Sequence, residues 1–205
     1  MRIYLVTDER LLLGKDLYRT VEAAVKGGVS MVQLREKESS TRKFIERAIR
    51  LKEVLTPYGV PLIINDRVDV ALAADADGVH VGQSDMPYEM VKRLLPEGKI
   101  IGLSVESPEQ VLEANNYDLD YVAASPVFST TTKTNTIVEW GLDGLRWIRS
   151  VSRHPLVAIG GIHSNNVASI CKAGADSVAV ISAIVSADDP ERAARELLEK
   201  SGELH

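Results

Sequence analysis

Eight short apolar segments recur along this chain, and they constrain its fold more than any other feature of the sequence. Their length and their content of β-branched residues favour strands over helices. Their nearly continuous apolar character suits a parallel sheet that is covered on at least one face. The predicted strands occupy residues 2–7, 30–35, 60–65, 77–82, 99–105, 119–125, 155–161 and 176–182.

Segments with helical periodicity lie between these predicted strands. Residues 16–28 and 40–55 each place apolar side chains on one side of a helix. Three serines, Ser40, Ser107 and Ser164, stand where such segments begin and are typical helix-start residues. Further segments of this kind cover residues 107–116, 164–174 and 189–200.

A weak internal sequence repeat indicates a repeated unit of helix, tight turn and strand. "AADADGVHV", "NYDLDYVAA" and "KAGADSVAV" each place an Asp two residues before a Val. About eight strands alternating with about eight helices predict an α/β protein with a (β/α)8 TIM-barrel fold. No Pro/Gly/Ser-rich linker divides the chain, so residues 1–205 are expected to form a single domain. A doubly wound open sheet is the alternative, because periodicity does not fix the topology.

The composition excludes several classes of function. A formal net charge of -5 does not resemble the basic surface of a nucleic-acid-binding protein. No segment approaches the length of a transmembrane helix, and the first residues do not resemble a signal peptide. One cysteine, Cys171, permits no intramolecular disulfide. We therefore expect a soluble cytoplasmic protein without nucleic-acid or membrane partners. Its oligomeric state is left open, with a homodimer as one alternative.

Polar residues follow the predicted strands at their carboxyl ends, which is where barrels of this kind carry their active sites. Singly, each has an ordinary explanation: Arg35 and Lys37 could pair with Glu36 or Glu38, and the aspartates could cap helices. Function is favoured because cations, carboxylates and donors converge on one rim. The candidates are Gln33, Arg35, Lys37, Asn65, Asp66, Asp85, Ser104, Lys133, Gly161, Ile181 and Ser182.

Two phosphate sites are expected at this rim. Asp66 and Asp85 beside several cations suit a Mg²⁺-bound polyphosphate, since Mg²⁺ is typically held by one or two carboxylates plus phosphate oxygens. The "AIGGI" and "VISAI" segments follow strand patterns seven and eight, whose loops often bind a phosphate through backbone N–H groups. The strip "STTTKT" would lie between the two sites.

The chain resembles the thiamin phosphate synthase family over nearly its whole length. The resemblance rests on "YLVTD", "VQLREK", "IINDR", "DGVHVGQSD", "IGLS", "SPVFSTTTK", "AIGGI" and "VISAI", in this order. It implies a (β/α)8 barrel that joins 4-amino-2-methyl-5-hydroxymethylpyrimidine pyrophosphate to a thiazole phosphate and releases pyrophosphate. It further implies a dissociative reaction, in which a pyrimidine methyl cation forms before the thiazole nitrogen attacks it.

The resemblance also implies a role for each candidate residue. The segment Gln33, Leu34, Arg35, Glu36 and Lys37 would hold the pyrimidine pyrophosphate, together with Asn65, Ser104 and Lys133. Asp66 and Asp85 would bind Mg²⁺. Arg35, Lys37, Ser104 and Lys133 are the expected catalytic group. Thr130, Thr131 and Thr132 would contact the thiazole, and Gly161, Ile181 and Ser182 would receive its phosphate.

Departures and rivals accompany this resemblance. Family members usually have glycine at the position of Ser125 and often proline at that of Ser129, which affects the conformation of the loop. A thiazole tautomerase of the same superfamily is one rival, but that branch typically has histidine at the position of Pro126 and lacks the second acidic residue, Asp85. A phosphate-ligand sensor without catalysis is the other rival, because fold alone does not establish function.

The four histidines are weaker candidates for the functional site. His80 falls inside a predicted strand and is expected to pack in the core rather than bind a ligand. His163 follows "GGI" and is a weak candidate for the phosphate site. His154 and His205 are expected at the surface.

Overall fold

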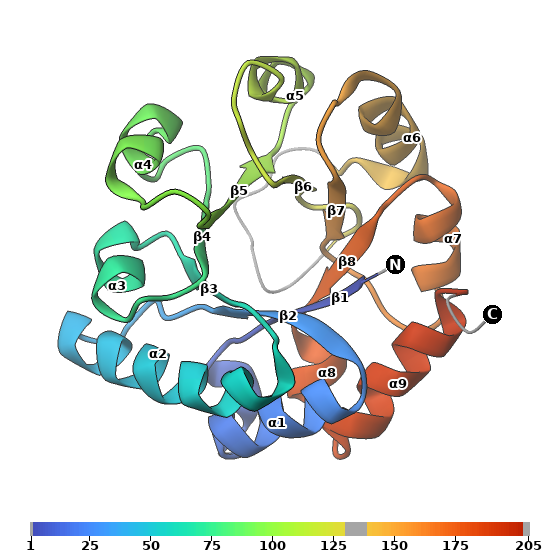
Figure 1. Cartoon of the computed structure of the whole chain (residues 1–205). Coiled ribbons are helices and arrows are strands. Elements are labelled where there is room, and N and C mark those ends of the chain that lie inside the picture. Colours follow the sequence, from blue (N-terminus) through green and yellow to red (C-terminus); the bar gives the residue numbers. More distant parts are fainter. Residues whose placement is uncertain (1, 130–138, 203–205) are drawn as a thin grey trace.

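The computed structural model describes residues 2–129 and 139–202, and Figure 1 shows their arrangement around a central ring of strands. Eight parallel strands close into a barrel in sequence order, because β1 pairs with both β2 and β8. The barrel prediction is confirmed, and the open-sheet alternative is wrong. The strands are β1 (Arg2–Val6), β2 (Val29–Leu34), β3 (Leu62–Asn65), β4 (Gly78–Val81), β5 (Ile100–Val105), β6 (Tyr121–Ala124), β7 (Leu156–Ile159) and β8 (Ser177–Val180).

Helices surround the barrel on its outside (Figure 1). Ser40 and Ser107 accept backbone N–H bonds from Lys43 and Gln110, so two of the three predicted helix starts are confirmed. Ser164 is not a cap, because its helix begins at Val167. The α-helices are α1 (Leu17–Lys26), α2 (Thr41–Leu55), α3 (Val68–Ala73), α4 (Tyr88–Leu94), α5 (Pro108–Ala114), α6 (Gly141–Val151), α7 (Val167–Lys172), α8 (Ser182–Val185) and α9 (Pro190–Lys200), and the 3₁₀ helices are η1 (Arg10–Leu12) and η2 (Thr56–Tyr58). In the described part of the chain, no helix is both long and apolar enough to cross a membrane.

The Asp of the weak internal sequence repeat has a structural role at the amino-terminal rim. Asp77, Asp120 and Asp176 each precede an even-numbered strand, and each accepts a backbone N–H from the strand before it at 2.8 Å. The backbone N–H of each Asp donates to the carbonyl of that same residue. Each Asp therefore joins the starts of two neighbouring strands by two hydrogen bonds.

Two apolar cores hold the barrel together. The larger core lies between the strands and the surrounding helices. The smaller core fills the inside of the barrel and contains two tyrosines, Tyr4 and Tyr121, that are almost fully buried. The cavity described below lies above this inner core, at the carboxyl ends of the strands.

Gly27→Ala is expected to lower the free energy of unfolding by about 2–3 kcal/mol, because overpacking forces backbone shifts. A Cβ at residue 27 would lie 2.2 Å from the backbone oxygen of Glu191, where α1 meets α9. Gly98→Ala is the control, since residue 98 faces open space and its φ of +84° alone costs about 1 kcal/mol. Urea unfolding of both variants measures the difference, and equal losses would contradict the close approach.

Candidate active site

A cavity of about 1350 Å³ lies at the carboxyl ends of the strands. This is the end where the sequence placed the candidate residues. Ten of those candidates line the cavity: Gln33, Arg35, Lys37, Asn65, Asp66, Asp85, Ser104, Gly161, Ile181 and Ser182.

The remaining candidates fall into two groups. Leu34 is fully buried in the barrel wall, and Glu36 is turned toward Arg47, so neither lines the cavity. Thr130, Thr131, Thr132 and Lys133 lie outside the described residues.

Two carboxylates, Asp66 and Asp85, lie near each other at the rim. Asp66 follows β3 with a φ of +61°, and its N–H donates to the His80 carbonyl at 2.8 Å. Asp85 accepts the N–H of Gly82 at 2.7 Å. Burial raises the pKa of Asp85, and the neighbouring Asp66 carboxylate raises it further. Such a pair of like charges in a partly buried site is a place where a cation would be stabilising.

Neither aspartate caps a helix. Helix α3 has Arg67 at its N-cap position, and α4 has Pro87 there. A non-glycine residue in the left-handed region costs free energy, and such residues cluster at functional sites. The cap interpretation of both aspartates is therefore wrong, and the strained backbone at Asp66 favours a functional one.

The two cations at this rim pair with aspartates rather than with the adjacent glutamates. Lys37 Nζ lies 2.5 Å from Asp66 Oδ2, and Arg35 Nη1 lies 2.6 Å from Asp8 Oδ2. Asp8 is buried, and its side chain is only 12% exposed. The alternative pairing of Arg35 and Lys37 with Glu36 or Glu38 is wrong, since Glu36 pairs with Arg47 and Glu38 with Arg10. Asp8 was missed as a site residue, although it ends the "YLVTD" segment that carries the resemblance.

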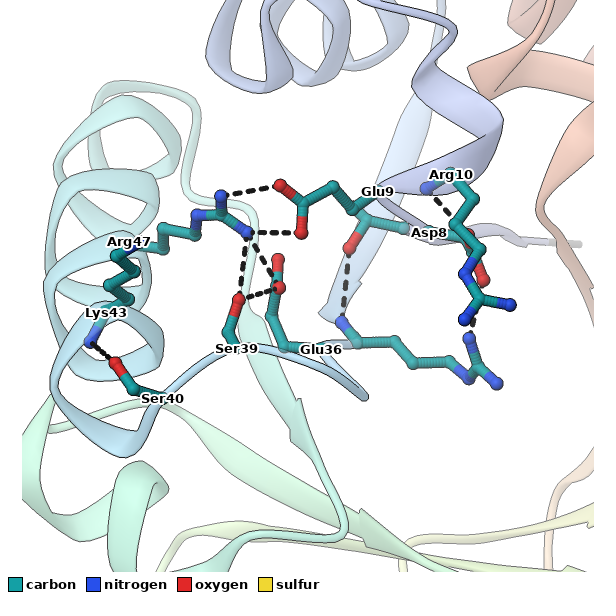
Figure 2. A network of polar contacts seen from close by, with 10 residues as sticks. Asp8, Glu9, Arg10, Glu36, Ser39, Ser40, Lys43 and Arg47 are labelled. Atoms are coloured by element: carbon teal, nitrogen blue, oxygen red, sulfur yellow. Dashed lines mark hydrogen bonds and ion pairs between the residues drawn. The ribbon is translucent and has the colours of Figure 1, made fainter.

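Arg47 of α2 holds the loop that presents these cations (Figure 2). Its guanidinium contacts Glu9 and Glu36 at 2.7 Å each, and Ser39 at 3.2 Å. Hydrogen bonding with Arg47 lowers the pKa of Glu9. The Glu36 side chain is only 4% exposed. The loop after β2 thus alternates, with Arg35 and Lys37 toward the cavity and Glu36 anchored to α2.

The opposite side of the cavity is formed by the glycine loop after β7 and the start of α8. Gly161 has a φ of +64°, and a Cβ there would lie 2.8 Å from both Phe128 Cβ and Ser129 O. Asn166 fixes this loop, since its Nδ2 donates to the Gly161 carbonyl and its Oδ1 accepts the His163 N–H. The first N–H groups of a helix have no acceptor within the helix, and Ser182 and Ala183 at the start of α8 line this side of the cavity.

The floor of the cavity carries a buried polar chain that the sequence did not reveal. Gln33 Nε2 donates to Tyr4 Oη at 2.6 Å, and Tyr4 Oη lies 2.9 Å from Tyr121 Oη. His80 Nδ1 lies 3.0 Å from Tyr121 Oη, and His80 Nε2 lies 2.8 Å from Ser104 Oγ. These five residues come from five strands, so only the closed barrel brings them together.

The other histidines are placed as follows. His163 is exposed and lines the cavity near the glycine loop. The prediction that His154 lies at the surface is wrong, because it is 6% exposed and its ring contacts two backbone carbonyls, of Leu119 and Ala114. His205 lies outside the described residues. The position of Ser125, a departure from the family pattern, lies in the cavity wall.

Comparisons with known proteins identify the family of this chain. A family model described as thiamine monophosphate synthase matches residues 3–184. The thiamine-phosphate synthase of Albidiferax ferrireducens is 53% identical over 190 residues, which are 93% of this chain and 87% of that protein. That of Vibrio campbellii is 51% identical over 197 residues, 96% of each chain. The solved thiamine phosphate pyrophosphorylase of Pyrococcus furiosus superposes with a TM-score of 0.89 and 40% identity, covering 98% of this chain and 96% of that one.

Proposed function

The chain belongs to the thiamine monophosphate synthase family and is a transferase with thiamine-phosphate synthase activity, and we propose that the cavity at the strand ends is where it joins its two substrates. The substrates are a pyrimidine methyl diphosphate and a thiazole phosphate. The observation that supports this placement is the meeting of Asp66, Asp85, Lys37 and Arg35 at one rim of the cavity.

The residues present fit a Mg²⁺ ion at Asp66 and Asp85. Both groups offer hard carboxylate oxygens, and the pKa of Asp85 is raised first by burial and further by the neighbouring Asp66 carboxylate, a negative charge pair that a cation would relieve. Among the residues that the structure describes, no third His, Cys, Asp or Glu joins them. This fits the usual pattern for Mg²⁺, whose other ligands are substrate phosphate oxygens and water. When bound, Mg²⁺ would supply positive charge to the leaving diphosphate.

Arg35 and Lys37 are proposed to bind the diphosphate oxygens. Asp8 holds the Arg35 guanidinium at 2.6 Å, which fixes one edge of its planar fork and leaves other N–H groups as donors. Lys37 is paired with Asp66, so a diphosphate would compete for its ammonium group. Ser104 and Asn65, at the ends of β5 and β3, supply neutral polar contacts. Leu34, Glu36 and Lys133 complete the proposed pyrimidine diphosphate site, as the resemblance implies.

The thiazole phosphate is proposed to lie at the glycine loop, against Gly161, Ile181 and Ser182. These positions line the same cavity as the cations, so both ligands would share one cavity. Thr130, Thr131 and Thr132 are proposed to contact the thiazole, again on the resemblance alone.

The protein has two tasks in this reaction: to stabilise developing charge and to hold the two substrates close together. Charge builds on the diphosphate as its C–O bond breaks, and preorganised cations stabilise that charge. The thiazole nitrogen must then be held close to the pyrimidine methyl cation, which is a task of proximity. Neither task uses a protein nucleophile.

The proposal is tested by mixing the purified protein with both substrates and measuring thiamin phosphate and pyrophosphate, with and without Mg²⁺. Both products are expected, and only with the metal. A phosphate-ligand sensor would release no pyrophosphate, and a thiazole tautomerase would convert a thiazole without consuming the pyrimidine. The presence of Asp85, with proline at position 126, favours the synthase over the tautomerase.

Ser182→Ala is expected to raise the KM for the thiazole phosphate several-fold while changing kcat less, because one contact to a bound anion is removed. Steady-state kinetics with the pyrimidine substrate saturating measures both constants. Ser150→Ala, on an exposed face of α6, is the matched control. A fall in kcat with an unchanged KM would place the thiazole phosphate elsewhere.

We also propose that residues 1–205 act as one catalytic domain in the cytoplasm, with Mg²⁺ and two small-molecule substrates and without nucleic-acid or membrane partners. The oligomeric state stays open, with a homodimer as one alternative, and light scattering of the purified protein decides it.

A further inference from the structure

The polar chain beneath the cavity has a direction set by its chemistry. The contact at one end has the Gln33 amide nitrogen as donor to Tyr4 Oη. A tyrosine hydroxyl has one hydrogen, and in only one arrangement do Tyr4 and Tyr121 each both accept and donate within these contacts. In that arrangement Tyr4, having accepted from Gln33, would donate to Tyr121, and Tyr121 would donate to His80 Nδ1. An imidazole that accepts at Nδ1 carries its hydrogen on Nε2, and this hydrogen would be donated to Ser104 Oγ.

Burial keeps this direction in place. Tyr4, Tyr121, Gln33 and His80 are all at most 7% exposed, so water has little access to exchange for their partners. Desolvation raises the pKa of both tyrosines far above the ordinary value, which keeps their hydroxyls protonated as donors. Neutral hydrogen bonds in such surroundings are costly to break, because an unpaired buried polar group is penalised.

The barrel interior leaves space for Tyr121, the middle residue of this series of hydrogen-bonded side chains. A Cβ at Gly102 of β5 would lie 2.1 Å from Tyr121 Cζ and 2.3 Å from its hydroxyl oxygen, so the Tyr121 ring occupies space that only glycine leaves. The Tyr4 ring meets the Tyr121 ring edge-on, and the His80 ring lies nearly parallel to it at 5.5 Å between centroids. Gln83 Nε2 donates to the Ser104 carbonyl at 2.6 Å, which fixes the backbone at the far end.

We propose that Tyr4, Tyr121 and His80 are positioning residues that orient the Ser104 hydroxyl as a hydrogen-bond donor into the cavity. Because Ser104 Oγ accepts from His80, its own hydrogen is available to an acceptor on the ligand side. The ligand chemistry that fits is a diphosphate oxygen or a ring nitrogen of the pyrimidine diphosphate. This inference rests on the proposed function for the identity of the ligand. The direction of hydrogen-bond donation from Gln33 to Ser104 does not depend on the proposed function.

The test combines a spectroscopic and a kinetic readout. In ¹⁵N NMR of the ligand-free protein, His80 is expected to show a pyridine-type Nδ1 and a pyrrole-type Nε2. The His80→Gln variant assigns the signal among the four histidines. In Tyr121→Phe, which removes only the hydroxyl, the fixed tautomer is expected to be lost. The same variant is expected to lower kcat/KM for the pyrimidine diphosphate by about tenfold to a hundredfold, the scale of one hydrogen bond to a charged group. The KM for the thiazole phosphate should not change.

Two further variants separate positioning from packing. His80→Gln keeps a side-chain amide that can donate to Ser104 and is expected to retain more activity than His80→Leu. Tyr58→Phe removes an exposed hydroxyl that bonds Glu22, and it should leave both kinetic constants unchanged. An Nδ1-protonated His80 in the wild type, or a Tyr121→Phe variant with unchanged kinetics, would overturn the inference. Failure of the proposed function would instead appear as a wild-type protein that forms no thiamin phosphate, and the tautomer measurement is independent of that result.

Discussion

Asp66→Ala is expected to lower kcat by about a hundredfold or more, the scale of losing a preorganised electrostatic contact. The substitution removes one of two carboxylates proposed to hold Mg²⁺ and leaves Lys37 without its partner at 2.5 Å. The protein should remain folded, because the Asp66 side chain lies at the rim of the cavity and pairs with the exposed Lys37 rather than packing in a core. Steady-state kinetics across a Mg²⁺ titration, with circular dichroism to verify folding, measures the effect.

The chain offers a matched control for this prediction. Asp69 lies three residues further on, in α3, where it pairs with Arg67 at the surface. Asp69→Ala should therefore keep near-normal turnover. The sequence makes the same hundredfold prediction for Lys133→Ala. Near-normal activity in Asp66→Ala would refute the assignment of the metal site.

Arg35→Ala is expected to lower kcat/KM for the pyrimidine diphosphate by about a hundredfold to a thousandfold. The guanidinium is one of the two cations that the structure places beside the carboxylates, and Asp8 holds it toward the cavity. Its removal also leaves the Asp8 carboxylate, 12% exposed, without its cation, so the free energy of unfolding should fall by about 1–3 kcal/mol.

Two variants isolate the causes of that loss. Arg35→Lys keeps the charge but loses the planar fork, and it should recover only part of the activity. Arg10→Ala removes an exposed arginine of the same rim, which pairs with Glu38, and should leave kinetics unchanged. Equal activity in Arg35→Ala and Arg10→Ala would show that Arg35 does not bind the diphosphate.

The barrel could be predicted because its information is local. Each strand lies in a nearly continuous apolar run, and helical patterns recur between these runs, so the type and order of the elements could be predicted without knowledge of long-range contacts. The repeated Asp was visible as a weak internal sequence repeat, although its hydrogen bonds to the preceding strand were not. Once the barrel is assumed, its carboxyl rim collects Asp66, Asp85, Arg35 and Lys37 by geometry alone.

The ion-pair and hydrogen-bond partners of the site residues could not be predicted from the sequence. Arg35 pairs with Asp8, 27 positions away, while the sequence suggested only neighbouring glutamates as ion-pair partners. Tyr4 and Tyr121 look like ordinary strand residues, and their hydrogen bond spans 117 positions across the closed barrel. His154 was expected at the surface, and only the fold shows two backbone carbonyls in contact with its ring. Local periodicity therefore predicts the strand or loop on which a residue lies. The residues that its side chain contacts depend on the closure of the barrel.

The central claim is that Asp66 and Asp85 hold a divalent ion beside a diphosphate bound by Arg35 and Lys37. It is tested most directly by anomalous diffraction from a crystal grown with Mn²⁺, as a stand-in for Mg²⁺, and inorganic pyrophosphate. We expect one ion peak at about 2.0–2.3 Å from a carboxylate oxygen of each aspartate, with pyrophosphate oxygens completing its coordination. An ion and a pyrophosphate located elsewhere, with Lys37 still bound to Asp66, would contradict the claim.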